Sequence, residues 1–257
     1  MRKIDSVTDL EPQLANARDY WLGWGDAFRQ DGDLVIFRSG VAHQVFNGVF
    51  RLTGTQPTSD ALEEASRRLD GVPWMWHVGP DSREGLVDDL VSLGATLGGT
   101  SPIMSVDLDR VIEQDGPPEL KIEEVDTPEA LGEWVEAYVP LFGVMPDQND
   151  TVKQVEANYA GAPGSLVRFA GRIDGRVAGT AALFDKHGVA GVYVVATGSG
   201  DRRRGIGTRL TAAALRAGQE RGLRVGTLQA SSTGALVYRR MGFEKVAEYQ
   251  LLAPPKR

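Results

Sequence analysis

An arginine- and glycine-rich segment, residues 202–208 (Arg-Arg-Arg-Gly-Ile-Gly-Thr), has the residue types that bind an anion. It follows a Val-rich stretch at 189–196, and the apolar residues after it recur with helical spacing. The segment is therefore expected to link a buried strand to a helix. A helix start offers unpaired N–H groups and the positive end of the helix dipole, and glycines let a ligand approach the backbone. The pattern predicts a site for a phosphorylated carrier.

A tyrosine thirty residues further along could donate a proton beside this site. Tyr238 lies in a segment expected to be a short helix, which ends Tyr-Arg-Arg-Met-Gly-Phe at residues 238–243. A phenol with a pKa near 10 protonates a thiolate only where the geometry assists the transfer. The alternative is a helix tyrosine packed in the core with a satisfied hydroxyl.

The elements that must position these residues follow from the pattern of the second half. Residues 174–175 (Asp-Gly) indicate a tight hairpin turn, and Thr127 followed by Pro128 indicates a capped helix start. The sequence predicts strands at 120–125, 166–173, 177–184, 189–196, 224–230 and 244–252, and helices at 127–138, 151–160, 206–221 and 233–240. This order predicts a mixed α/β fold whose sheet is antiparallel early and partly parallel late.

The first half shows a shortened repeat of the element order of the second half (strand, turn, helix, strand) and lacks the arginine–glycine helix start. Strands are expected at 34–37, 49–52, 72–78 and 103–108, and helices at 59–69 and 86–93. Residues 114–119 contain consecutive prolines and a glycine, which break helix and strand alike. We predict an N-terminal domain at 1–113, a linker at 114–119 and a C-terminal domain at 120–257.

Two motifs of the second half resemble those of the GNAT superfamily of acyl-CoA N-acyltransferases. The first is Arg202-x-x-Gly205-x-Gly207, and the second is Tyr238-x-x-x-Gly242-Phe243. The similarity covers about residues 120–252. It implies a GNAT-like fold in the C-terminal half and a smaller, degenerate GNAT-like domain in the N-terminal half, as in tandem members of the superfamily.

The resemblance also implies acetyl-CoA as co-substrate and assigns roles to individual residues. Tyr238 would be the catalytic proton donor to the departing thiolate. The strand end at 195–197 would pair with the pantetheine amides, and Ser231 stands where many members have Asn. The coenzyme-binding residues so implied are Val195, Ala196, Thr197, Arg202, Arg203, Arg204, Gly205, Ile206, Gly207, Thr208, Ser231 and Tyr238.

The general base is not identified by the sequence, because residues 189–196 contain no carboxylate. Tyr193, Asp185, His187 and Glu123 remain open, as does ordered water. The predicted function is acetyl transfer from acetyl-CoA to a primary amine of a small-molecule acceptor. Transfer would be direct in a ternary complex, because no cysteine can carry the acyl group. The alternative is a non-catalytic acyl-CoA-binding or regulatory module.

Composition limits the other function classes. The net charge of −7 over 257 residues disfavours nucleic-acid binding, and three separated histidines without cysteine predict no metal site. The chain turns polar at its start and has no apolar run long enough to cross a membrane. We therefore expect a cytoplasmic protein without a membrane partner, either a monomer or a homodimer.

Overall fold

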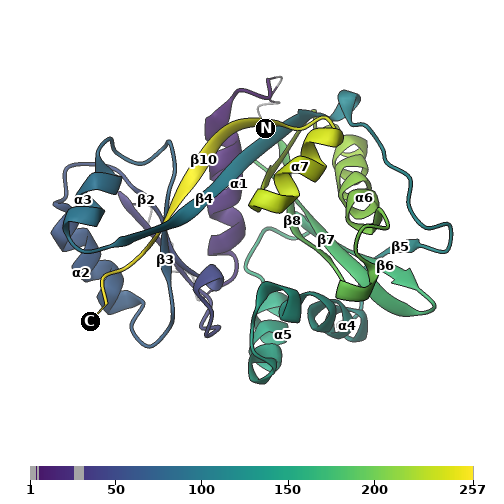
Figure 1. The fold of residues 1–257 in the computed structure, drawn as a ribbon, viewed down its shortest axis with the longest axis horizontal. Helices are drawn as coiled ribbons and strands as arrows, with labels where there is room; N and C mark the ends of the chain where they lie inside the picture. Colours follow the sequence, from purple (N-terminus) through teal and green to yellow (C-terminus); the bar gives the residue numbers. More distant parts are fainter. Residues whose placement is uncertain (1–3, 5, 26–31, 257) are drawn as a thin grey trace.

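The computed structural model describes residues 4, 6–25 and 32–256, which form one ten-stranded mixed sheet with helices on both faces (Figure 1). Part of the polar chain start, on which the expectation of a cytoplasmic protein partly rests, lies outside the described residues. The strands are β1 (Leu34–Arg38), β2 (Asn47–Leu52), β3 (Met75–Val78), β4 (Thr96–Asp107), β5 (Lys121–Glu124), β6 (Leu166–Ile173), β7 (Arg176–Lys186), β8 (Val189–Thr197), β9 (Val225–Gln229) and β10 (Glu244–Ala253). The described α-helices are α1 (Leu10–Leu22), α2 (Thr58–Arg68), α3 (Leu86–Ser92), α4 (Pro128–Tyr138), α5 (Asn149–Ala157), α6 (Ile206–Glu220) and α7 (Ser232–Arg240).

The strand order is β1-β2-β3-β10-β4-β9-β8-β7-β6-β5. Two neighbouring pairs, β2–β3 and β8–β9, are parallel, and the others are antiparallel. The last strand of each half lies in the sheet of the other, because β10 pairs with β3 and β4 while β4 also pairs with β9. The predicted mixed α/β fold is confirmed. The division at 114–119 stays a prediction, since the halves share one sheet.

Local signals act as expected in the second half. The Thr127 hydroxyl accepts from the Ala130 N–H at 3.1 Å and caps α4, with Pro128 in its first turn. Asp174 (φ 50°) and Gly175 (φ 82°) form the tight turn between β6 and β7. Positive φ at both central positions matches the twist of a two-residue hairpin.

Four of the five apolar clusters among the described residues lie between the sheet and its helices. α6 and α7 pack on one face of the C-terminal half, and α4, α5 and the end of α1 pack on the other. α2 and α3 cover one face of the N-terminal half, while α1 covers the other. α1 thus contacts both halves and lies behind β4 and β10 in Figure 1.

The elements that differ from the sequence predictions include α1, β4 and β3, and α5 spans Asn149–Ala157 rather than 151–160. α1 is absent from those predictions because its buried face carries polar side chains, which hide the apolar period: Gln13 accepts from Thr227 Oγ1 at 2.9 Å, and Asn16 donates to the Phe184 carbonyl at 3.0 Å. β4 begins at Thr96 rather than at residue 103; its exposed first residues lack alternation and are held by pairing with β10. β3 begins at residue 75 rather than 72.

In the part of the chain that the structure describes, no helix has the length and apolar character that a membrane crossing requires.

Candidate functional site

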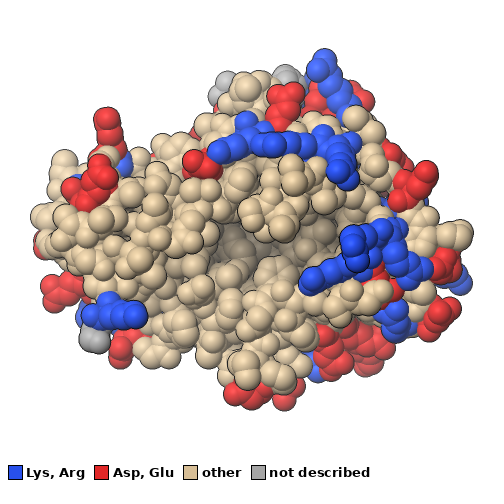
Figure 2. Space-filling model, viewed as in Figure 1, with Lys and Arg blue, Asp and Glu red and all other residues tan. Residues whose placement is uncertain are grey.

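The two parallel strands of the C-terminal half separate after a short paired stretch. β8 and β9 pair only at Ala190 with Gly226 and at Gly191 with Thr227. Beyond these pairs β8 continues to Thr197, beside β7. Figure 2 shows the surface hollowed at its centre, near where β8 and α7 lie in Figure 1. The unpaired side of β8 is therefore available to a ligand that hydrogen-bonds as a strand does. We call this separation the C-terminal gap.

A bulge in β8 shapes the strand beside this gap. The register with β7 shifts between Thr180 and Ala182, so that β8 carries one extra residue there. Val194 has φ 50°, and its carbonyl accepts from the buried Thr180 hydroxyl at 2.8 Å. Bulges bend a strand and redirect its backbone groups, and they are frequent next to functional sites. The predicted pantetheine-binding residues 195–197 follow directly.

Two glycines at the start of α6 have different neighbours. Gly205 is the N-cap with φ 82°, and the Asp115 carbonyl oxygen lies 2.2 Å from the position of a Cβ on Gly205. A Cβ on Gly207 would lie 3.3 Å from Thr197 Oγ1. Gly205 is therefore required by its own backbone and by the linker, whereas Gly207 brings the helix start against the end of β8. The first amides of α6 have no intrahelical acceptor and are oriented for an anion.

Asp201 organises the loop before α6, although no sequence motif marks it. Its buried carboxylate pairs with Arg176 at 2.6 Å and with Arg204 at 2.9 Å, and these cations lower its pKa. Arg204 also pairs with Glu119 of the linker. Because Arg176 lies 25 residues away, only the fold brings the three together. The Arg204 charge is thus already engaged within the protein.

Arg202 and Arg203 differ from Arg204. Both are exposed, and neither makes an ion pair within the described chain. Arg203 has φ 63°, which turns the chain before the helix start. Figure 2 shows Lys and Arg side chains gathered beside the hollow, in the region where Figure 1 places α6 and α7. These charges favour an anion at the edge of the gap.

Ser231 and Tyr238 lie on α7, close to α6. The Ser231 hydroxyl accepts from the Gly234 N–H at 3.1 Å and caps α7. Tyr238 is partly buried and packs against Phe243 at 5.6 Å between ring centroids. Burial raises the pKa of Tyr238 to about 12, and the side chain of Thr211, one turn after Gly207, opposes this shift. The phenol is therefore protonated at neutral pH.

The two carboxylates and the histidine considered as general bases lie away from the gap. His187 pairs with Asp19 at 2.9 Å in the turn before β8, at the opposite end of that strand from Thr197. Asp185 lies in the same region, 3.6 Å from Arg221. Glu123 lies on β5, at the edge of the sheet, and pairs with Arg172 of the neighbouring strand β6.

Tyr193 lies close to the gap, but its hydroxyl already has a hydrogen-bond partner within the protein. Its hydroxyl donates to Asn16 Oδ1 at 2.7 Å, and its ring stacks on Tyr20 with centroids 3.7 Å apart. Burial raises its pKa well above the usual value. A phenol that is already donating and hard to ionise is a poor base.

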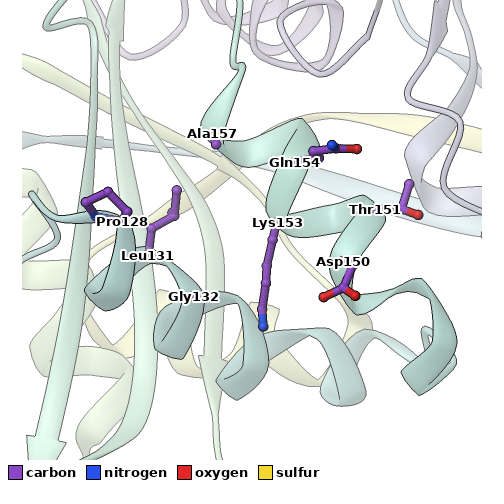
Figure 3. A pocket seen from close by; sticks show the side chains of 8 residues that line it. All are labelled: Pro128, Leu131, Gly132, Asp150, Thr151, Lys153, Gln154 and Ala157. Atoms are coloured by element: carbon purple, nitrogen blue, oxygen red, sulfur yellow. The ribbon is translucent and has the colours of Figure 1, made fainter.

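A separate pocket of about 400 Å³ lies between α4 and α5 (Figure 3). Its lining residues are Pro128, Leu131, Gly132, Asp150, Thr151, Lys153, Gln154 and Ala157. None of these is a predicted coenzyme-binding residue, so this pocket is distinct from the C-terminal gap. Among the residues that the structure describes, no group of three His, Asp or Glu side chains is arranged to hold a metal ion.

Comparison with protein families identifies the segment that contains the gap. A sequence model of the acetyltransferase (GNAT) family matches residues 129–243. This range includes β8, the Arg202–Thr208 segment and Tyr238. No curated protein sequence matches the chain.

Solved structures resemble the chain over nearly its whole length. A GCN5-related N-acetyltransferase from Kribbella flavida is 20% identical, with 95% of this chain and 96% of that chain covered and a TM-score of 0.67. A GCN5-related N-acetyltransferase from Sphaerobacter thermophilus is 17% identical, with 99% and 96% covered and a TM-score of 0.63. A tandem GNAT protein from the clavulanic acid biosynthesis pathway is 12% identical, with 98% of both chains covered and a TM-score of 0.60. At these identities the likeness establishes the fold.

Proposed function

Because residues 129–243 belong to the GNAT family of acetyltransferases, we propose that this chain transfers an acetyl group from acetyl-CoA to a primary amine of a small-molecule acceptor. The observation that carries the proposal is the close approach of the α6 start to the end of β8, where a Cβ on Gly207 would lie 3.3 Å from Thr197 Oγ1. This approach places a helix start suited to an anion beside an unpaired strand edge, and Tyr238 lies near Thr211 of the same helix. In acetyl-CoA, the diphosphate would match the helix start, the amide-bearing pantetheine arm would match the strand edge, and the thioester would match Tyr238.

The residues present fit this coenzyme. The amides of 206–208 would bind the diphosphate, with Arg202 and Arg203 adding charge. The open side of β8 at 195–197 would pair with the pantetheine amides, and Ser231 would add a hydrogen bond from the start of α7. Arg204 would act indirectly, through its pairs with Asp201 and Glu119.

The chemistry would run by direct transfer in a ternary complex. The amine nitrogen attacks the thioester carbonyl carbon, the C–S bond breaks, and the thiolate takes a proton from Tyr238. The raised pKa of Tyr238, about 12, keeps the phenol protonated at neutral pH but makes it a weak acid, so the transfer depends on the thiolate being positioned beside it. The phenolate left behind then regains a proton from water. The amine loses its own proton to water in the hollow.

Replacing Tyr238 with Phe tests the chemical role. We expect acetyl-CoA to bind with unchanged affinity and the turnover of an amine panel to fall about 10²-fold or more, the usual contribution of a positioned proton donor. Calorimetry measures the binding, and thiol release measures turnover. Tyr159→Phe is the matched control, because the Tyr159 hydroxyl donates to the Tyr20 carbonyl away from α7. Equal turnover in Tyr238→Phe and the parent would exclude Tyr238 as the donor.

A non-catalytic acyl-CoA-binding or regulatory module is the second candidate. It is favoured by the positions of Asp185, His187 and Glu123, all away from the gap. The amine panel separates the two functions. Binding of acetyl-CoA by the parent without thiol release on any amine would support the module.

A further inference from the structure

The described strands of the N-terminal half repeat the order of the C-terminal half. β1 and β2 are antiparallel, as are β7 and β8, and β2 and β3 are parallel, as are β8 and β9. α2 and α3 follow β2 and β3 as α6 and α7 follow β8 and β9. Both parallel pairs are short: β2 and β3 pair only at Gly48 with Met75 and at Val49 with Trp76. The N-terminal half therefore contains a second gap, between the ends of β2 and β3.

Arg83 closes this N-terminal gap. Its backbone N–H donates to the carbonyl of Leu52, the last residue of β2, at 2.9 Å. Its guanidinium donates to the Gln56 carbonyl at 3.2 Å, to Thr58 Oγ1 and to Asp89 Oδ2 at 2.7 Å. One residue thus ties together the end of β2, the start of α2 and the body of α3. These are the places that a strand-like arm and an anion would occupy in the other half.

The start of α2 is also unsuited to an anion. Its N-cap is Pro57, and Asp60 lies in its first turn, where a negative charge repels a phosphate. The Thr58 hydroxyl donates to Asp89 Oδ2 at 2.7 Å and ties α2 directly to α3. The anion-binding position is therefore filled by the chain's own cation and flanked by its own carboxylates.

The C-terminal gap has no equivalent closure among the described residues. The first residue after β9, Ala230, donates its N–H to the Pro102 carbonyl of β4 at 2.9 Å and not to β8. The end of β8 in the C-terminal half is therefore unpaired on the side facing β9, whereas the corresponding end of β2 in the N-terminal half is bonded to Arg83.

We propose that the N-terminal half is a closed copy of the coenzyme-binding half, held shut by Arg83, and that each chain consequently binds one coenzyme. The stoichiometry rests on the proposed function of the C-terminal half, whereas the closure does not. The two parts are tested by separate measurements.

Calorimetric titration with acetyl-CoA tests the stoichiometry. We expect one site per chain in the parent and none in folded Gly207→Leu, whose side chain would enter the C-terminal site. Two sites in the parent, one of which remains in Gly207→Leu, would overturn the proposal and leave the C-terminal function intact. A single parental site that remains in Gly207→Leu would place the coenzyme outside the C-terminal gap and overturn both proposals. An absence of binding in the parent would instead overturn the proposed function.

Arg83→Met tests the closure without any coenzyme. We expect the melting temperature to fall by about 5 °C, because three side-chain hydrogen bonds are lost. We also expect amide exchange at residues 53–58 and 83–89 to accelerate at least tenfold. Arg67→Met is the control, since Arg67 is an exposed arginine of α2, the helix whose start Arg83 contacts. Equal exchange in the two variants would overturn the closure.

Discussion

Gly205 and Gly207 stand two residues apart at the start of α6 but serve different needs. The positive φ of Gly205 and the Asp115 carbonyl beside it leave no room for a Cβ. Gly207 does not have a positive φ, and a Cβ there would lie 3.3 Å from Thr197 Oγ1, a tight contact that a small shift of this side chain would relieve, and 3.8 Å from Val195 Cγ1. The motif therefore combines one glycine that the fold requires with one that the proposed ligand requires.

Substitutions at the two glycines should separate these needs. Gly205→Ala is expected to lower the free energy of unfolding by about 2 kcal/mol or more, because the left-handed conformation costs an L-residue about 1–2 kcal/mol before the clash with Asp115 is added. Gly207→Leu should fold with nearly parent stability and lose coenzyme affinity by at least a hundredfold. Urea unfolding and calorimetry measure both quantities. A stable Gly205→Ala, or full coenzyme affinity in Gly207→Leu, would contradict this division.

At the scale of the element, the bulge in β8 depends on one buried side chain. Thr180 is fully buried, and its hydroxyl satisfies the Val194 carbonyl at the bulge. A β-branched residue at positive φ is strained and persists only where its surroundings hold it. The hydrogen bond from Thr180 contributes to stabilising the backbone conformation of Val194.

Thr180→Val should therefore weaken both the fold and the site. It leaves the Val194 carbonyl buried without its partner, which costs about 1–3 kcal/mol of unfolding free energy. We also expect weaker coenzyme binding, because the strand end at 195–197 is less well fixed. Thr53→Val is a control, since the exposed Thr53 hydroxyl donates to Asp33. Unchanged unfolding in Thr180→Val would show that the bulge holds without this bond.

The sequence predicted the elements of the C-terminal half well, because their signals are local. The cap at Thr127, the Asp-Gly turn and the helical spacing after Gly207 each act within a few residues. α1, the first part of β4 and the pairs of Asp201 were not predictable in this way. Each depends on partners far along the chain, such as Thr227 for Gln13 and Arg176 for Asp201. The lack of a carboxylate within β8, by contrast, was already visible in the composition of that strand.

At the scale of the whole molecule, the exchange of β4 and β10 makes each half depend on the other. Leu252 and Tyr249 of β10 are buried in the clusters of the N-terminal half. β4 in turn pairs with β9 over five residues, from Ile103 to Asp107. Neither half can bury its apolar surface without a strand from the other.

The separated halves should therefore not fold alone. Residues 1–113 expressed without β10 are expected to give a poorly dispersed NMR spectrum, and so are residues 120–257 expressed without β4. Co-expression of the two pieces should restore a folded complex. A protease cut engineered within 114–119 of the folded chain is the control, and it should leave the halves together on a sizing column. A folded, monomeric 1–113 would contradict this expectation.

Buried tyrosines should make the protein unstable in alkali. Burial raises the pKa of five of the six tyrosines, namely Tyr20, Tyr138, Tyr193, Tyr238 and Tyr249. Above pH 10 the unfolded chain loses phenol protons that the folded chain retains, so the free energy of unfolding falls as the pH rises. The loss should begin near pH 10 and, for Tyr238, continue to about pH 12. Urea unfolding between pH 8 and 11.5 measures this loss of unfolding free energy, and phenolate absorbance reports the ionisation of the tyrosines. A free energy of unfolding that stays constant across this range would contradict the prediction.

The position of β10 between β3 and β4 also sets the order of events during synthesis. β3 and β4 leave the ribosome more than a hundred residues before the strand that must separate them. Throughout that interval the edges of both strands are exposed, and a wrong pairing between them is available. The N-terminal half can therefore complete its sheet only after almost the entire chain has been translated. We expect a chaperone that shields strand edges to raise the yield of folded protein.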